Sequence, residues 1–275
     1  MSGRMRLRML PENTGILRSP LHFENADVGG EMVIFNQEKC ILCRKCMQDC
    51  YPQAIQKENE KMTVSGECML CGHCVAICPK GAVSICDYED EPEEYIKEKF
   101  QIESDNMLHM IKFRRSIRNY REKIVEREKL EMMIEAGRYT ATVSNRQEIS
   151  YIVVQDKKNE LKHMVLKKVE QYVNGENAVQ WQEKLFRNAS VIIYIVGDNA
   201  INAGLAAQNM ELMAATLGLG IFYNGYLTKI SGSFTEIREF LQIGEKEIQL
   251  CFMAGYPAVE YRRTAPRKKP EILWM

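Results

Sequence analysis

The sequence has no long apolar run and no excess of charge of either sign. Its 275 residues include 37 Lys and Arg against 37 Asp and Glu, so neither nucleic acid nor an anionic membrane is expected as a partner. The longest apolar stretch, Val191–Val196, is far shorter than the ~18 residues of a membrane span. The basic segment MSGRMRLRML is not followed by the apolar region of a secretory signal. These absences predict a cytoplasmic protein.

The sequence also lacks the motifs of several enzyme classes. No Ser-His-Asp arrangement or metal-bound water site is evident, and no catalytic side chain is predicted. Gly218 and Gly220 follow a predicted helix instead of a strand, and a third glycine is missing, so they do not form a dinucleotide fingerprint. We expect these glycines to let the backbone approach a flat ligand.

Cysteine, in contrast, is abundant. Eight of the ten cysteines form two runs with the same C-x₂-C-x₂-C-x₃-C spacing, and each cysteine of the second run lies 28 residues after its counterpart. This is the spacing of bacterial ferredoxins with two [4Fe–4S] clusters. The runs are Cys40, Cys43, Cys46 and Cys50, and Cys68, Cys71, Cys74 and Cys78. The sequence therefore predicts two iron–sulfur clusters and electron transfer.

The fourth cysteine of each run is expected to bind the cluster of the other run. The predicted ligands of cluster one are Cys40, Cys43, Cys46 and Cys78. Those of cluster two are Cys68, Cys71, Cys74 and Cys50. Structural zinc would favour cysteine pairs with a long gap between them, and disulfides would imply an oxidising compartment, so both alternatives are weaker. His73 occupies a spacer position and is not a predicted ligand, and Cys86 and Cys251 are expected to be packing residues.

Composition predicts four segments. Residues 32–86 form the ferredoxin domain, and residues 106–275 are long enough for a second core. Between them, residues 87–105 carry many acidic side chains and Pro92, which predicts a solvated linker. Residues 1–31 are an N-terminal extension, either disordered or, if translation starts at Met32, absent from the protein.

Helical and extended patterns are interleaved in residues 106–275. Apolar faces at Met107, Leu108 and Ile111 and around Leu130 predict helices. Residues 151–154, 191–196 and 248–253 are rich in apolar and β-branched side chains and predict strands. Residues 203–217 are apolar nearly all round, which predicts a buried helix. This order indicates an α/β or α+β domain with helices covering a sheet.

Four ordered motifs in this second domain resemble the nitroreductase family of flavoproteins. RRSIRNY at 114–120 resembles the flavin-phosphate motif of the family, and its three arginines and serine suit a phosphate. TVSNRQ at 142–147 resembles the S-x-x-N-x-Q segment, with Thr in place of Ser. QNMELMAA at 208–215 with GLG at 218–220 resembles the central helix and its end, and GYP at 255–257 followed by Arg267 resembles the C-terminal motif. The whole chain resembles ferredoxin–nitroreductase fusions of anaerobic bacteria.

The resemblance implies an α+β fold with a mostly antiparallel sheet, which binds FMN at the interface of a homodimer. Carried over by motif, Arg114 and Ser116 hold the phosphate and ribityl chain, and Arg115 belongs to the same cofactor-binding run. Arg118 faces the pyrimidine side of the ring, where a cation favours the reduced, anionic flavin. The remaining implied flavin contacts are Asn145 and Gln147 from the partner subunit, the Asn224–Gly225 backbone near N5, and Arg267 at the phosphate.

The sequence thus predicts an FMN- and iron–sulfur-dependent oxidoreductase that reduces an electron-poor substrate such as a nitroaromatic compound or a quinone. Two alternatives stay open. In the first, the chain is an electron-transfer module between protein partners without small-molecule turnover. In the second, its clusters only stabilise the N-terminal domain. External ferredoxin or flavodoxin and NAD(P)H are the candidate electron donors, although the sequence has no nicotinamide fingerprint.

Overall fold

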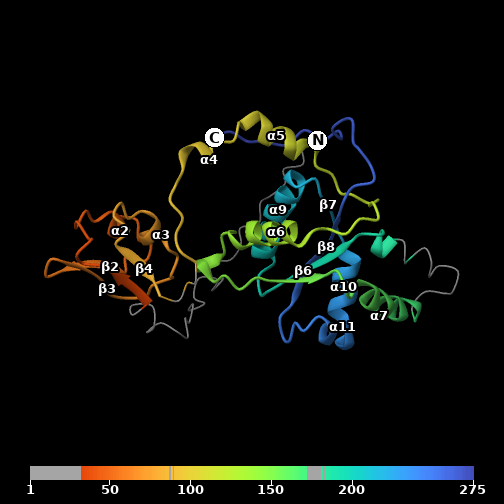
Figure 1. Ribbon diagram of the computed structural model, residues 1–275, viewed down its shortest axis with the longest axis horizontal. Helices are drawn as coiled ribbons and strands as arrows, with labels where there is room; N and C mark the ends of the chain where they lie inside the picture. Colours follow the sequence, from red (N-terminus) through yellow and green to blue (C-terminus); the bar gives the residue numbers. More distant parts are fainter. Residues whose placement is uncertain (1–31, 87, 89, 172–180, 182–183) are drawn as a thin grey trace, which may run out of the picture. The chain divides into compact units, whose positions relative to one another are not determined.

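A computed structural model of the chain describes residues 32–86, 88, 90–171, 181 and 184–275 (Figure 1). The chain divides into two compact units with the boundary between Glu93 and Glu94, inside the predicted linker. The expected extension, residues 1–31, lies outside the described residues. The predicted domain limits stay a prediction, although a four-residue helix, α4 (Lys97–Phe100), occupies part of the segment expected to be a solvated connector.

The first unit consists of short elements in which the sequence repeat is visible. Strands β1 and β4 pair antiparallel, and so do strands β2 and β3. Helices α2 and α3 each contain the third cysteine of a run, Cys46 and Cys74. The elements are β1 (Val33–Phe35), α2 (Lys45–Gln48), β2 (Ile55–Glu58), β3 (Lys61–Val64), α3 (His73–Ala76) and β4 (Val83–Ile85).

The core of this first unit is small. It contains the buried side chains of Val33, Ile55, Met62, Val83 and Ile85, together with the third cysteine of each run. The other six cysteines of the two runs lie at its edge or surface. So small an apolar core gives limited stability by itself. Two bound clusters, ligated by eight cysteine side chains, would add to the stability of this unit.

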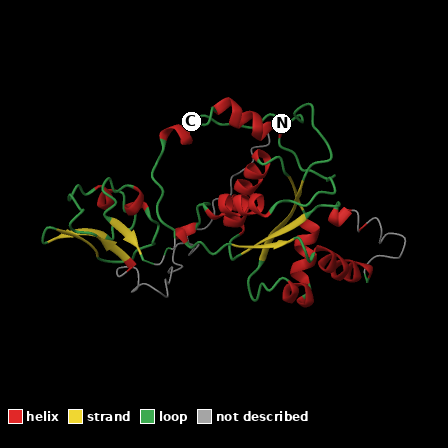
Figure 2. Cartoon of the chain, viewed as in Figure 1, coloured by secondary structure: helices red, strands yellow, loops and turns green. Residues whose placement is uncertain are grey.

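The second unit is a sheet with helices on both faces (Figure 2). The sheet order is β5-β6-β8-β7, and every neighbouring pair is antiparallel. Its strands are β5 (Ser150–Val154), β6 (Val191–Val196), β7 (Gly220–Tyr223) and β8 (Ile248–Gly255). Its helices are α4, α5 (Ser104–Phe113), α6 (Arg127–Arg138), α7 (Lys158–Glu170), α9 (Ala200–Thr216), α10 (Gly225–Ser233) and α11 (Thr235–Phe240), with a 3₁₀ turn at Val143–Asn145.

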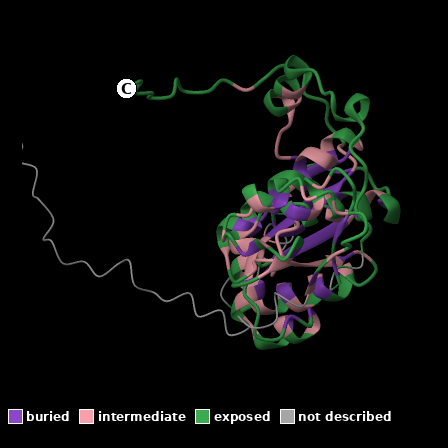
Figure 3. Cartoon of the chain, turned by 90° about the vertical axis from the view of Figure 1, so that its left-hand side faces the viewer, coloured by how far each residue is buried: buried purple, intermediate pink, exposed green. Residues whose placement is uncertain are grey.

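Strand β6 shows why the sheet is covered on both faces. Its residues alternate between two cores, with Ile193 packed in the core that includes α6 and α9, and Tyr194 in the core that includes α7, α10 and α11. All six residues of β6 are buried, and Figure 3 shows this sheet largely in the colour of buried residues. A strand buried on both faces is continuously apolar, as this sequence is. The predicted α+β class is confirmed.

The predicted elements are present with small shifts of their ends. The strand expected at 248–253 continues to Gly255, and the helix expected at 203–217 begins earlier, at Ala200, where Asn199 caps its N-terminus. Strand β7 was not predicted, because it has four residues and starts at a glycine. No helix among the described residues is long and apolar enough to cross a bilayer.

Candidate cluster and cofactor sites

The structure brings cysteines of both runs around two separate cavities. The first, called cavity one, is lined by Cys40, Cys43 and Cys46 of the first run and by Cys78 of the second. The fourth cysteine of the second run lies beyond the end of helix α3 at Ala76, just before a turn in which Gly81 N–H donates to Cys78 O at 3.3 Å. Cavity one therefore has the four cysteines that the spacing assigns to cluster one.

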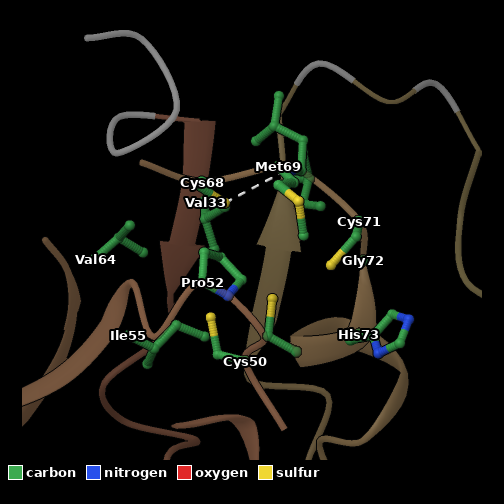
Figure 4. Close-up of a pocket in the computed structure, with 13 residues that line it drawn as sticks. Val33, Cys50, Pro52, Ile55, Val64, Cys68, Met69, Cys71, Gly72 and His73 are labelled. Atoms are coloured by element: carbon green, nitrogen blue, oxygen red, sulfur yellow. Dashed lines mark hydrogen bonds between the residues drawn. The ribbon is translucent and has the colours of Figure 1, made fainter. Parts of the chain in front are cut away.

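Cavity two has the reciprocal composition. It is lined by Cys68, Cys71 and Cys74 of the second run and by Cys50 of the first. Figure 4 shows the sulfur atoms of Cys50 and Cys71 pointing into the same space, while the His73 ring points away from it. The His73 Nδ1 atom lies 3.2 Å from Asp49 Oδ2. The ring therefore has a carboxylate neighbour and is directed away from the cysteine sulfurs.

The spread of the thiols suits a cluster better than a single ion. Among the described residues, no three Cys, His, Asp or Glu side chains converge closely enough to hold one metal ion. In a [4Fe–4S] cluster each iron takes one thiolate, so the four sulfurs stand apart around the cage. Four cysteines around one cavity fit this group.

The thiols need help to ionise. Burial raises the pKa of Cys74 to about 11 and also raises the pKa values of Cys46 and Cys68. Because iron binds the thiolate, cluster assembly must release these protons. A backbone donor favours the ionised form of Cys68, because Leu70 N–H donates to its Sγ at 3.4 Å. Ala82 N–H likewise donates to Cys78 Sγ at 3.2 Å.

The two cysteines outside the runs differ in exposure. Cys251 is buried in the core beside Tyr194, as expected of a packing residue. Cys86 is exposed, so its prediction as a packing residue is wrong. It follows the last residue of β4, where the chain leaves the small core, and spacing along the sequence did not reveal this.

The RRSIR segment follows helix α5 and is fixed to strand β7. Ile117 N–H donates to Ile221 O at 2.9 Å, and the Ile117 side chain is buried. A Cβ added to Gly220 would lie 2.1 Å from Ile117 Cγ1. The sequence predicted that Gly220 lets the backbone approach a flat ligand. In the structure, the group that lies close to Gly220 is the Ile117 side chain. The buried isoleucine holds Ser116 and Arg118 on either side of it in place.

Arg114 has a buried acidic partner that the sequence analysis missed. Arg114 Nη1 lies 2.8 Å from Oε1 of Glu211, a residue of α9 with 4% exposure. Tyr223 OH donates to Glu211 Oε2 at 3.3 Å, and burial together with this carboxylate raises the pKa of Tyr223. Guanidinium has five donor hydrogens, so Arg114 can bind Glu211 through Nη1 and keep other donors for a phosphate. The one signal in the sequence was an acidic residue within an apolar helix.

Arg187, which no sequence motif included, lies beside the same aromatic ring as Arg118. The guanidinium carbons of Arg118 and Arg187 lie 5.8 and 5.6 Å from the centre of the Phe222 ring. Arg187 Nε is buried without a hydrogen-bond partner among the described residues. A buried N–H without an acceptor is costly, and an electron-rich edge of a flavin would satisfy it. No motif includes Arg187, because it lies just before β6 in a segment without a recognisable pattern.

The segment at 142–147 has an unusual backbone. Ser144, Asn145 and Gln147 have φ angles of 52°, 54° and 51°, and Gln147 N–H donates to Thr142 Oγ1 at 3.0 Å. Left-handed conformations are disfavoured for residues with a Cβ and persist at sites where the surrounding structure imposes them. The turn presents Asn145 and Gln147, the predicted contacts from a partner subunit.

Asn224 caps helix α10 from a buried position. Its Oδ1 accepts from Leu227 N–H at 3.0 Å, and its Nδ2 donates to Leu185 O at 2.7 Å. The side chain is therefore used within the fold, while Gly225 is the first residue of the helix. The first N–H groups of a helix have no intrahelical acceptor, so the backbone here can donate to a ligand.

The other predicted cofactor contacts are less constrained. Arg115 is half-buried, and Arg267 is exposed on the C-terminal segment, with Nη1 3.5 Å from Pro266 O. The same segment reaches the RRSIR motif through Tyr261, whose OH donates to Ser116 O at 3.5 Å. The roles of Arg115 and Arg267 at a phosphate stay predictions.

Comparison with known families identifies both units. The model of the nitroreductase family matches residues 111–256. The chain belongs to the nitroreductase family. The model of a 4Fe-4S dicluster domain matches residues 32–79. The predicted combination of a nitroreductase-like FMN oxidoreductase with a ferredoxin-type 4Fe–4S domain is confirmed.

Individual relatives and one solved structure are similar to parts of the chain. The chain is 27% identical over 173 residues to an FMN reductase (NADPH) of Bacillus subtilis, a match that covers 56% of this chain and 67% of that protein. It is 30% identical over 112 residues to the NADP-reducing hydrogenase subunit HndD of Solidesulfovibrio fructosivorans, covering 32% of this chain but 18% of that subunit. A nitroreductase of Bacteroides fragilis, solved with bound FMN, shares the fold with a TM-score of 0.53 and 20% identity, over 61% of this chain and 98% of that one.

Proposed function

We propose that the chain passes electrons between two [4Fe–4S] clusters and FMN to reduce an electron-poor conjugated compound, such as a nitroaromatic compound or a quinone. The observation that carries this proposal is the presence, in one chain, of two cavities with four cysteines each and of a nitroreductase-family domain. FMN, when bound, would exchange single electrons with the clusters and electron pairs with the substrate.

The side chains described above have distinct tasks in this proposal. Arg114, held by Glu211, and Ser116, held beside the anchored Ile117, bind the phosphate and ribityl chain. Arg118 and Arg187 place positive charge beside the pyrimidine edge, where reduction adds negative charge. The contacts with Glu211, Ile221 and Phe222 fix these side chains within the protein itself, which supports the proposed roles.

The donor and the assembly state are part of the proposal. The ferredoxin-type domain suits an external ferredoxin or flavodoxin, and the Bacillus subtilis relative is named as an FMN reductase (NADPH). A homodimer is supported by apolar side chains that this single chain leaves exposed. Leu108 and Ile111 of α5 are 47% and 42% exposed, and Leu273 and Trp274 near the C-terminus are 81% and 87% exposed. A cytoplasmic location stays a prediction.

Stopped-flow measurements under anaerobic conditions test the function. The holoprotein, reduced by dithionite and freed of excess reductant, is mixed with menadione or a nitrofuran. We expect the clusters and the flavin to reoxidise and, with reduced ferredoxin or NADPH supplied, repeated turnover. Reoxidation by acceptor proteins without any reaction with small acceptors would favour the alternative, an electron-transfer module between protein partners. Clusters that do not exchange electrons with the flavin would favour a purely structural role.

A further inference from the structure

The 28-residue repeat allows the two cluster cavities to be compared position by position. Each has three cysteines from one run and the fourth from the other. Each third cysteine is buried on a short helix, and each helix follows a residue in the left-handed region, Arg44 with φ 61° and Gly72 with φ 73°. The arrangement of ligands is therefore nearly the same at the two sites.

The charges around the two cavities are not the same. Cavity one is lined by three cations, Arg44, Lys45 and Lys80. Counted along the repeat, their counterparts are Gly72, His73 and Pro52, and all three line cavity two. The described residues that line cavity two include no Lys or Arg. The exposed carboxylate of Asp49 lies beside His73 at this site.

Arg44 has a backbone conformation that is unfavourable for a residue with a side chain. Its φ of 61° favours glycine, the residue that the repeat has at position 72. The arginine is thus not explained by the conformation of the turn. Arg44 lies at the wall of cavity one and also lines a surface pocket beside Cys50, so Lys45 and Lys80 are the cations that distinguish cavity one most clearly.

Two other determinants of the reduction potential of a cluster, hydrogen bonds to the cysteine sulfurs and exposure to water, are either similar at the two cavities or also favour a higher potential at cavity one. Backbone N–H groups donate to a cysteine of each set, Cys78 at cavity one and Cys68 at cavity two. Exposure differs at the second cysteine of each run, because Cys43 is exposed and Cys71 is half-buried. Greater contact with water stabilises the added negative charge of a reduced cluster, as do nearby cations.

We infer that the two clusters are electrochemically unequal. The cluster held by Cys40, Cys43, Cys46 and Cys78 has the higher reduction potential and takes the first electron. The inference rests on the proposed binding of two [4Fe–4S] clusters. With one electron in the pair, the electron would reside on the cluster in cavity one, and no bond or proton transfer would be needed to move it there. With both clusters reduced, the electron in cavity two would have the larger driving force for a downstream acceptor.

A redox titration of the full chain, followed by electron paramagnetic resonance, tests this inference. Iron content and flavin content are measured first on each preparation. We expect the wild-type clusters to be reduced in two separate steps at low ionic strength. In the variant R44G/K45Q/K80Q the higher potential should fall toward the lower one, while the lower potential changes less. The Lys61→Gln variant is the matched control, because Lys61 is exposed in the same unit and lines neither cavity.

A variant that adds a cation at cavity two tests the inference even if the triple variant misfolds. His73→Lys adds a cation at the counterpart of Lys45, and we expect it to raise the lower potential alone. Two clusters with equal wild-type potentials, or a triple variant that shifts only the lower step, would overturn the inference. In that case the full iron content would still support the cluster assignment. An iron content of one cluster, about four atoms, would overturn the cluster assignment itself.

Discussion

The two units of this chain build their sites in different ways. In the first unit, most ligands of a cavity come from one run of eleven residues or fewer, so local spacing nearly defines the site. In the second unit, the candidate flavin contacts come from segments far apart in the sequence, and pairs such as Arg114–Glu211, 97 residues apart, hold them in place. A site whose ligands are close in the sequence is easy to recognise. A site held by contacts between distant residues is sensitive to substitutions that lie outside every motif.

The largest effect is expected from one ligand in the first unit. Cys71→Ser should remove the cluster in cavity two, which lowers the iron content from about eight atoms to about four, or convert that cluster to another form, because a thiolate of cavity two is lost. Flavin content should not change. The measurement is iron and flavin per chain after anaerobic purification.

The matched control for that change is Cys86→Ser. Cys86 is exposed and lines neither cavity, so its replacement should keep both clusters. Loss of iron from the control alone would show that the assignment of ligands to the two runs is incorrect. Loss of flavin from Cys71→Ser would show that the two units do not behave independently.

The next effect tests the long-range support of the second unit. Glu211→Ala should leave Arg114 without its buried partner and lower the free energy of unfolding of this unit by roughly 1.5–3 kcal/mol, the range for hydrogen bonds to charged groups. FMN affinity should fall as well, since Arg114 is no longer fixed. Thermal unfolding and fluorescence titration with FMN measure the two effects.

An exposed ion pair in the same unit is the natural control. Arg127 and Glu131 are also paired at 2.8 Å, but both side chains are largely exposed, and such pairs contribute little to stability. Glu131→Ala should therefore unfold at nearly the wild-type temperature. Equal destabilisation by both substitutions would indicate that burial of Glu211 is not what matters.

A third change concerns packing between the RRSIR segment and β7. Gly220→Ala would place a Cβ 2.1 Å from Ile117 Cγ1, and we expect a loss of about 1–3 kcal/mol, typical of overpacking. FMN binding should weaken because the segment that carries Ser116 and Arg118 must move. Gly232→Ala is the control, since a Cβ at Gly232 meets nothing within 4 Å; a deficit of similar size in that variant would contradict the proposed close contact.

The smallest expected effect separates two arginines that look alike in the sequence. Arg114→Ala should weaken FMN binding about ten-fold or more, since a charge-assisted hydrogen bond is lost, and added FMN should restore activity. Arg118→Ala and Arg187→Ala should lower the flavin midpoint potential even when FMN is saturating, because the lost charge favours the reduced form. Flavin affinity and midpoint potential are measured for each variant. An unchanged potential in Arg118→Ala would place that side chain away from the ring.

Much of this molecule follows from its sequence alone. The cysteine spacing indicated two clusters and their crossed ligands, because a cluster loop is short and each ligand lies within a few residues of the next. The apolar run of β6 and the small, apolar side chains of helix α9 indicated a covered sheet, because burial on both sides requires apolar residues throughout. The family motifs indicated the class of enzyme, which the match to residues 111–256 confirms.

The tertiary structure decided what depends on contacts between distant residues. The pairing of Arg114 with Glu211, the approach of Ile117 to Gly220, and the position of Arg187 beside Phe222 join segments that no spacing rule connects. The charge difference between the cavities also needed the fold: Lys80 follows the second run, yet the crossed arrangement of the chain places it at cavity one. A sequence motif specifies a site when its ligands are neighbours along the chain. The charges around a site come from residues far apart in the sequence, and only the folded chain brings these residues together.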